Sequence, residues 1–385
     1  MMAAMSKNAC VNSFAPGRTE IAGNHTDHQG GRVIAAALDC GISMLVEARE
    51  DGHVHVESEG FDTFEIDVAD CSPREDERLG TQALVRGMVA GLRARGVRVG
   101  GFDVKAKSTI PSGGGLSSSA AFELALGEAL NVLYADGRVA PSDMVAAAVE
   151  AERGWFGKPC GFMDQLAVEF GGINLFDFSQ MPAWTAHPIE FNLQESGYAL
   201  YLVDTHCDHS LYTDEYAHVA SDMNNVAREL GARVLANVPE RDFLRAFPDL
   251  RRKLGDRSVL RACHYYNEMR LVDGRAEALV RGDMDAFLSL TRASSASSAQ
   301  FLQNVSTFDA QQQPAMVALA VVAGALGGKG ALRIHGGGFG GTIQAFVPEN
   351  DVDGFVETVD GLLGDGSCRR FSIGGKGAHA SWQNR

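Results

Sequence analysis

Two hydrophobic patterns alternate along the chain, and together they predict mixed α and β structure. In "GFDVKAKSTI", residues 101–110, apolar and polar residues alternate with period two, as in a half-buried strand. In "SSAAFELALGEALNVL", residues 118–133, large apolar residues instead recur at helical spacing, at Phe122, Leu126, Leu130 and Leu133. The first stretch therefore predicts a strand, and the second predicts a helix with one apolar face.

The same patterns predict the remaining elements. We expect a strand-forming stretch around a glycine break at 32–50, strands at 53–58, 173–178 and 198–205, a largely helical stretch over 214–330, and strand, glycine loop and strand over 331–349. A chain of 385 residues is long for one hydrophobic core. We therefore expect an α+β protein of two domains, 1–195 and 196–385.

Two local signals refine the expected helices. Ser142 precedes an apolar-periodic stretch and predicts a helix that begins with a serine cap. The longest apolar run, "AMVALAVVAGAL" at 315–326, is too short to span a bilayer and predicts a buried helix.

Charge and cysteine usage narrow the class of protein. The formal net charge of −15 argues against nucleic acid and against an anionic membrane surface, because both attract basic proteins. Seven scattered cysteines without a C-x-x-C pair favour reduced thiols. The first residues, "MMAAMSKNACVNSF", lack the apolar core of a signal peptide. We therefore expect a cytoplasmic protein with a small-molecule ligand.

A glycine run provides the first candidate for chemistry. "PSGGGLSSSAAFELA", residues 111–125, places three glycines and three serines between a predicted strand and a predicted helix. Glycines let the backbone approach a phosphate, and the free amides at a helix start would face it. No G-K-[ST] follows, so this is not a P-loop. The alternative is a glycine turn in which Ser117 or Ser118 caps the helix.

A second candidate lies near the N-terminus. "APGRTEIAGNHTDHQGG", residues 15–31, contains many polar side chains between glycines: Arg18, Glu20, Asn24, His25, Asp27 and His28. A sugar needs a partner for each hydroxyl, and a loop of this composition can supply them. The alternative is a solvated turn.

Two acidic residues stand among apolar neighbours. Glu152 shares a helical stripe with Val145 and Val149, so its carboxylate needs a cation, either an arginine or a metal. Asp164, in "GKPCGFMDQLAVEFGG", either caps a short helix or has a charged role. "GGGFGG", residues 336–341, is either a turn between strands or a ligand loop.

Taken in order, these motifs resemble those of the small-molecule kinases that include galactokinase, homoserine kinase, mevalonate kinase and phosphomevalonate kinase. "APGR…GNHTDH" is similar to the first motif of that superfamily, "PSGGGLSSSAA" to the second and "GGGFGG" to the third. Within it, "HTD", "PCGFMDQ" and "TDEY" at 213–216 most resemble the galactokinase family. The motifs span Ala15 to Gly341, which is nearly the whole chain.

The resemblance implies a fold and a reaction. The N-terminal domain would be like the second domain of ribosomal protein S5, the C-terminal domain would be ferredoxin-like, and the active site would lie between them. The reaction would transfer the ATP γ-phosphoryl group to the anomeric hydroxyl of a sugar, with ATP and Mg²⁺ as cofactors. The resemblance carries no expectation for the oligomeric state.

The resemblance also implies roles for matching residues. Asp164 would accept or polarise the proton of the sugar hydroxyl, and Arg18 would keep Asp164 ionised and stabilise charge on the phosphoryl group. Ser119 and Glu152 would lie near Mg²⁺. The ATP phosphates would bind Gly113, Gly114, Gly115, Leu116, Ser117, Ser118 and Ser119. The sugar would bind Arg18, Glu20, Asn24, His25, Asp27, Gly161, Asp164 and Tyr216.

The chain departs from the family pattern at the sugar loop. Glu20 stands where these kinases usually have asparagine, Asn24 where they have glutamate, and His28 where they have tyrosine. The alternatives are therefore a kinase for a related sugar (N-acetylgalactosamine, L-arabinose or galacturonate) and a non-catalytic sugar sensor.

Overall fold

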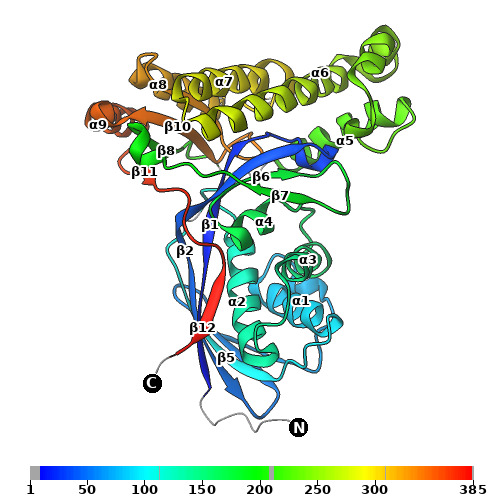
Figure 1. Ribbon diagram of the computed structural model, residues 1–385, viewed down its shortest axis with the longest axis vertical. Coiled ribbons are helices and arrows are strands. Elements are labelled where there is room, and N and C mark those ends of the chain that lie inside the picture. Colours follow the sequence, from blue (N-terminus) through cyan, green and yellow to red (C-terminus); the bar gives the residue numbers. More distant parts are fainter. Residues whose placement is uncertain (1–8, 112, 208–211, 308, 384–385) are drawn as a thin grey trace.

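Two β-sheets organise the protein, which we describe from a computed structural model (Figure 1). The structure describes residues 9–111, 113–207, 212–307 and 309–383. All but one of the strands in the first sheet come from the N-terminal half of the chain, and the second sheet comes from the C-terminal half.

The first sheet has eight strands, with the order β12-β1-β2-β5-β3-β4 and with β6 and β7 continuing from β2. Its strands are β1 (Cys10–Ala22), β2 (Arg32–Arg49), β3 (His53–Ser58), β4 (Phe64–Asp67), β5 (Gly101–Ser108), β6 (Ile173–Asp177), β7 (Thr185–Pro188) and β12 (His379–Trp382). All neighbours are antiparallel except β3 and β5, which run parallel. The predicted strands at 53–58, 101–110 and 173–178 are thus confirmed.

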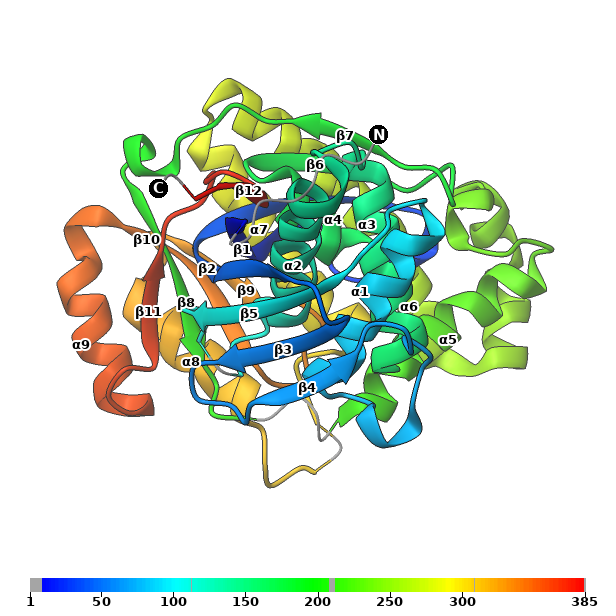
Figure 2. The ribbon, with the colours of Figure 1, turned by 90° about the horizontal axis from the view of Figure 1, so that it is seen from below.

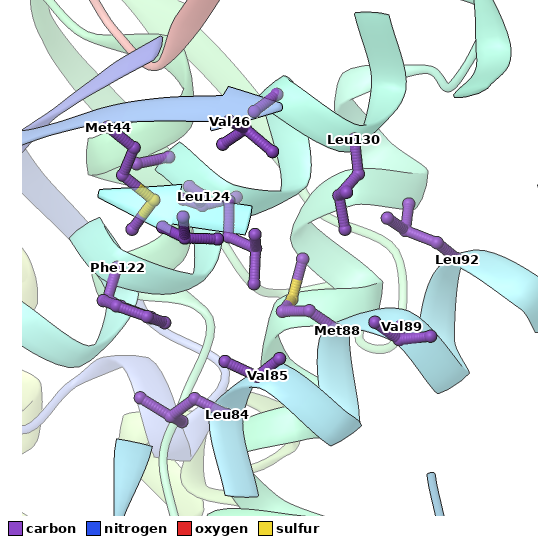
Figure 3. Packing of buried hydrophobic residues seen from close by; sticks show 14 of the residues in the cluster. Met44, Val46, Leu84, Val85, Met88, Val89, Leu92, Phe122, Leu124 and Leu130 are labelled. Carbon is purple, nitrogen blue, oxygen red and sulfur yellow. The ribbon is translucent and has the colours of Figure 1, made fainter. Parts of the chain in front are cut away.

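Helices cover one side of this sheet (Figure 2). They are α1 (Thr81–Ala94), α2 (Ser118–Ala135), α3 (Pro141–Ala151), which continues as the π-helical turn η3 (Glu152–Phe156), and α4 (Met163–Phe170). The predicted stripe of α2, from Phe122 to Leu133, is buried. Leu124 on its other side is buried too, because α2 lies between the strands and α1 (Figure 3).

The second sheet has the order β11-β8-β10-β9 and is antiparallel throughout. Its strands are β8 (Tyr198–Asp204), β9 (Ala331–Ile334), β10 (Thr342–Pro348) and β11 (Cys368–Phe371). The helices of this half are α5 (Thr213–Glu229), α6 (Glu240–Arg281), α7 (Met284–Ser297), α8 (Pro314–Leu326) and α9 (Val352–Leu363). Strand order and the helices before β9 and β11 give the expected ferredoxin-like arrangement.

The two faces of the second sheet pack against different elements. One face packs on α8 and α9. The other packs on α6, α7 and the later half of β1 and earlier half of β2, where Ile21, Ile34 and Leu38 are buried. These parts of β1 and β2 therefore join the two halves of the molecule. The division into domains at residue 195 stays a prediction, although the change from one sheet to the other falls between β7 and β8.

Three local expectations are wrong. The stretch 315–326 is not a buried helix: α8 buries only one face, while Val317 on the other is 54% exposed. Ser142 does not cap α3, which begins at Pro141 after Ala140, since proline suits a first helical position. Gly41 does not break the strand. It continues β2 at a point where a Cβ would lie 2.4 Å from the ring of Phe14. Among the described residues, no helix is long and apolar enough to cross a membrane.

Candidate active site

The carboxylate of Asp164 lies where β1, the glycine run and α4 meet. Asp164 is in the first turn of α4, which begins after Phe162, so it does not cap this helix. Arg18 of β1 donates from Nε to Asp164 Oδ1 at 2.8 Å. Ser117 donates from Oγ to Asp164 Oδ2 at 2.6 Å. The charged role is therefore favoured over the capping role for Asp164.

These contacts decide the ionisation of Asp164. Burial alone would raise the pKa of Asp164, but the charge of Arg18 and the hydrogen bonds from Arg18 and Ser117 outweigh it and lower the pKa to about 2. Asp164 is consequently ionised at neutral pH. Its side chain is still 18% exposed, so a ligand can reach it.

The glycine run forms an open turn in front of α2. Gly113, Gly115 and Ser117 all have left-handed backbone conformations. Among the described residues, a Cβ added at Gly113 or Gly115 would meet no atom within 4 Å, so these residues leave space beside the start of α2. Arg18 holds the turn in place through two hydrogen bonds. Its Nη1 donates to Gly115 O at 2.7 Å, and its backbone N–H donates to Leu116 O.

Ser117 stands at the cap position of α2, but its hydroxyl makes no capping hydrogen bond. The hydroxyl is instead committed to Asp164. The serine-cap alternative is therefore wrong in this respect, and the first amides of α2 have no side-chain cap. Free amides at a helix start are suited to hold an anion.

Glu152 is fully buried and gathers three donors. Its Oε1 accepts from Ser119 Oγ at 2.9 Å and from Lys158 Nζ at 3.1 Å, and its Oε2 accepts from Gln165 Nε2 at 2.5 Å. The basic side chain that contacts Glu152 is therefore Lys158 and not an arginine, while the metal stays a prediction. Sequence reasoning missed Lys158, although a basic residue six positions after Glu152 was a usable signal.

The chemistry of this cluster fits a magnesium ion. Magnesium prefers carboxylate and hydroxyl oxygens and keeps much of its shell for water and phosphate. Glu152 and Ser119 supply the first two, and the buried oxygens Glu123 Oε1 and Gln165 Oε1 have no hydrogen-bond donor. Within the described ranges, no three His, Cys, Asp or Glu residues form a metal site by themselves. A metal ion at Glu152 and Ser119 would therefore need further oxygens from a bound phosphate or from water.

The sugar loop brings Asp27 next to this centre. A Cβ added at Gly161 would lie 2.3 Å from Asp27 Oδ2, so any larger residue would displace that carboxylate. Burial and the nearby charge of Asp164 raise the pKa of Asp27 to about 6, against the lowering effect of the His28 amide. Tyr216 of α5 is close enough to feel the charges of Asp27, Asp164 and Arg18, and its side chain is 48% exposed.

His25 is held more tightly than expected for a sugar ligand. Its ring is 5% exposed, its Nε2 lies 2.9 Å from Gly337 O, and its Nδ1 lies 3.1 Å from His28 Nε2. The ring of Tyr216 packs against it with centroids 5.1 Å apart. His25 therefore supports Tyr216 and the 336–341 loop rather than offering a free ring nitrogen.

Asn24 and Glu20 both form hydrogen bonds to residues of the C-terminal half of the chain. Asn24 is fully buried, donates to Gly336 O at 2.5 Å and accepts from Asn304 Nδ2 at 2.8 Å. Glu20 forms a buried ion pair with Arg333, with Oε1 and Nη2 2.5 Å apart. Both polar atoms of the Asn24 side chain, and one carboxylate oxygen of Glu20, are therefore already bonded within the protein, and the sugar-binding roles of these two residues stay predictions.

The 336–341 loop is tied to the sugar loop rather than being an isolated turn. Its carbonyls accept from Asn24 and His25, and a Cβ at Gly337 would lie 2.0 Å from the ring of Tyr216. From β10, Thr342 Oγ1 reaches Gly114 O at 3.4 Å. The three glycine-containing motifs therefore meet around one centre.

Comparison with known proteins identifies the family. Residues 83–172 match the GHMP kinases N terminal domain, and residues 4–48 match the galactokinase galactose-binding signature. The galactokinase of Streptomyces coelicolor is 33% identical over 353 residues, which are 90% of this chain and 87% of that protein. This chain belongs to the galactokinase family.

A second curated galactokinase and two solved structures are also similar to this chain. A galactokinase of Actinobacillus pleuropneumoniae serotype 5b is 29% identical over 371 residues, 95% of this chain and 91% of that protein. The crystal structure of Lactococcus lactis galactokinase complexed with galactose matches with a TM-score of 0.83 and 25% identity, covering 96% of this chain and 94% of that chain. The L. major mevalonate kinase structure shares the fold, with a TM-score of 0.66 and 18% identity over 98% of this chain and all of that chain. The expected kinase fold is confirmed.

Proposed function

We propose that this chain is an ATP-dependent galactose 1-kinase, which converts galactose and ATP to galactose 1-phosphate and ADP. Its membership of a kinase family implies that it uses ATP. The observation that carries the proposal is the position of Asp164, held ionised between Arg18 and Ser117 beside the open glycine turn. The galactokinase relatives and the galactose-bound relative support galactose as the substrate.

In this proposal, Asp164 accepts a hydrogen bond from the anomeric hydroxyl and directs its oxygen toward the γ-phosphorus. A pKa of about 2 makes Asp164 a weak base, so it orients the hydroxyl early and takes the proton late. This order suits phosphoryl transfer, because its loose transition state needs little deprotonation of the attacking oxygen.

Arg18 has two tasks in the same step. Its Nε keeps Asp164 ionised, and its charge stabilises the oxygens of the phosphoryl group as they gain negative charge. The turn from Gly113 to Ser119 and the first amides of α2 bind the ATP phosphates. Bound Mg²⁺ neutralises phosphate charge. Glu152 and Ser119 would hold this ion.

On the sugar side, Asp27 is the principal acceptor for galactose hydroxyls, and Tyr216 covers the sugar from α5. The Gly161 backbone lies against Asp27 and completes this wall. The burial of Asn24 favours a second candidate, a kinase for a related sugar, because the acceptor that galactokinases usually have at this position is missing. A reducing, cytoplasmic location and the two-domain division at residue 195 belong to the proposal as well.

A sugar panel tests the proposal. Wild-type protein is incubated with ATP, Mg²⁺ and galactose, N-acetylgalactosamine, L-arabinose or galacturonate, and ³¹P NMR locates the new phosphate. We expect galactose to be the best substrate and its 1-phosphate to be the product. A preference for another sugar would replace galactose by the second candidate.

A substitution separates a kinase from a sensor. Asp164→Asn should lower kcat by about 10²–10⁴-fold, as expected for loss of a positioned acid–base group, while calorimetry still detects sugar binding. Asp143→Asn, on the exposed side of α3, is the matched control. Absence of turnover in the wild type together with intact sugar binding would favour the sensor.

A further inference from the structure

A pocket of about 360 Å³ lies beside the sugar loop, at His28. Its walls are His28, Asn224, Arg228, Ala232, Arg233 and Val234. The volume is within the roughly 300–1,000 Å³ of small-molecule sites. None of these residues binds the sugar or ATP in the proposed function.

The charge of this pocket is opposite to that of the protein. The chain carries a formal net charge of −15, yet the pocket walls include two arginines and no carboxylate. Within the described part of the chain, neither Arg228 nor Arg233 forms an ion pair, and the Arg228 guanidinium donates a hydrogen bond to the amide oxygen of Asn225 at 3.1 Å. The nearest acid in sequence, Glu229, is instead paired with Lys253 at 2.6 Å.

A chain of hydrogen bonds determines which donors and acceptors His28 and Asn224 present to the pocket. Burial lowers the pKa of His25 to about 3 and that of His28 to about 4, so both rings are neutral. Because His25 Nε2 donates to Gly337 O, its Nδ1 must accept from His28 Nε2. His28 Nδ1 then accepts from Gln29 Nε2, which also donates to Asn224 Oδ1.

In this chain of hydrogen bonds, Asn224 Oδ1 accepts from Gln29. The side-chain N–H groups of Asn224 are therefore available to a ligand in the pocket. The polar side-chain groups that line the pocket are therefore the amide donor of Asn224 and the guanidinium donors of Arg228 and Arg233. Guanidinium groups pair with two oxygens of one phosphate or carboxylate at a time. The side chains of the walls thus fit an anion.

From this geometry we infer that the pocket binds a small metabolite bearing a phosphate or carboxylate group, held by Arg228, Arg233 and Asn224. Its occupation is linked to the sugar site. Asn224 and Arg228 lie on α5, the helix that carries Tyr216, and the hydrogen-bonded chain from Asn224 ends at His25, on which Tyr216 packs. This link rests on the proposed function, whereas the binding of the anion does not.

Calorimetry on the whole protein tests the binding, with glycerol 3-phosphate as the phosphate probe and citrate as the carboxylate probe. The pocket variant is Arg228→Gln/Arg233→Gln. The matched control, Arg241→Gln/Arg245→Gln, removes the same charge from exposed positions of α6. We expect one probe to bind the wild type and the control equally, and the pocket variant at least about 10-fold more weakly, from the loss of charged hydrogen bonds.

Which probe binds identifies the anion class. Equal binding to all three proteins would place the anion elsewhere, and absence of binding by both probes would also overturn the inference. The link is tested by titrating galactose with and without the bound probe. We expect the galactose Kd to change at least about 2-fold in the wild type and to stay constant in the pocket variant. An unchanged Kd in both would overturn the link. Failure of galactose to bind at all would instead count against the proposed function.

Discussion

Ser117 donates a 2.6 Å hydrogen bond to Asp164 from a residue whose own backbone is left-handed, with φ of 59°. A serine in that conformation is strained, and glycine is not. Ser117 therefore has a side chain at a backbone position where glycine would be less strained. The hydroxyl holds the second oxygen of the Asp164 carboxylate, while Arg18 holds the first.

Ser117→Gly should lower kcat without lowering the stability of the protein. Removal of the hydroxyl frees Asp164 Oδ2, and kcat should fall about 10-fold, the effect of one charge-assisted hydrogen bond. The melting temperature should stay equal or rise, because the left-handed strain is relieved. Calorimetric melting and steady-state kinetics measure the two effects. Parallel loss of both would show that Ser117 is only structural.

Gly161→Ala should weaken sugar binding without unfolding the protein. The new methyl group would lie 2.3 Å from Asp27 Oδ2 and push that carboxylate aside. We expect KM for the sugar to rise about 10-fold, as for loss of a hydrogen bond to a charged group. Gly154→Ala is the matched control, since a Cβ there meets nothing within 4 Å. Similar kinetics for the two variants would contradict this role of Gly161.

The pH dependence of kcat/KM for the sugar should report Asp27. With a pKa of about 6, Asp27 is ionised above that pH and accepts sugar hydroxyls, but below it the carboxyl is protonated and loses acceptor strength. kcat/KM should therefore fall tenfold per pH unit below about pH 6 in the wild type. Asp164, with a pKa of about 2, stays ionised throughout.

Asp27→Asn is the companion measurement. The variant should have a lower kcat/KM that no longer changes between pH 5 and pH 7. A fall below pH 6 that persists in this variant would assign the titration to another group.

Glu169→Gln should stabilise the protein in alkaline solution. Burial and the neighbouring charge of Glu128 raise the pKa of Glu169 to about 9, and its Oε2 has no hydrogen-bond partner. The folded state therefore holds a proton that the unfolded state releases near pH 4.3, so wild-type stability falls as pH rises from about 4 to 9. The variant lacks this fall. Melting curves should coincide near pH 4.5, and at pH 8.5 the variant should melt about 2 °C or more higher.

Local sequence patterns were sufficient to predict most strands and helices. The period-two stretch at 101–110 and the helical stripe from Phe122 to Leu133 both fold as expected. The predictions were wrong where packing against residues distant in the sequence determines which side chains are buried. The pattern of 315–326 is apolar all round, but only one side of α8 meets the sheet.

The candidate site shows the same limit. The motifs predicted which residues gather near Asp164, and the roles assigned to those residues stay predictions. Pairing partners could not be read from the sequence: Glu20 binds Arg333 across 313 positions, and Asn24 binds Asn304 across 280. Such contacts depend on how β1 meets the second half of the chain, which no local periodicity encodes.

The pairing of β1 with β12 determines when the first sheet can be completed during synthesis. β1 is made long before β12, yet its edge at residues 11–14 is covered only when residues 379–382 arrive. An uncovered strand edge is a template for pairing with other chains. During synthesis, therefore, this edge of β1 stays exposed until residues 379–382 have been made and released, and the first sheet cannot be completed before then.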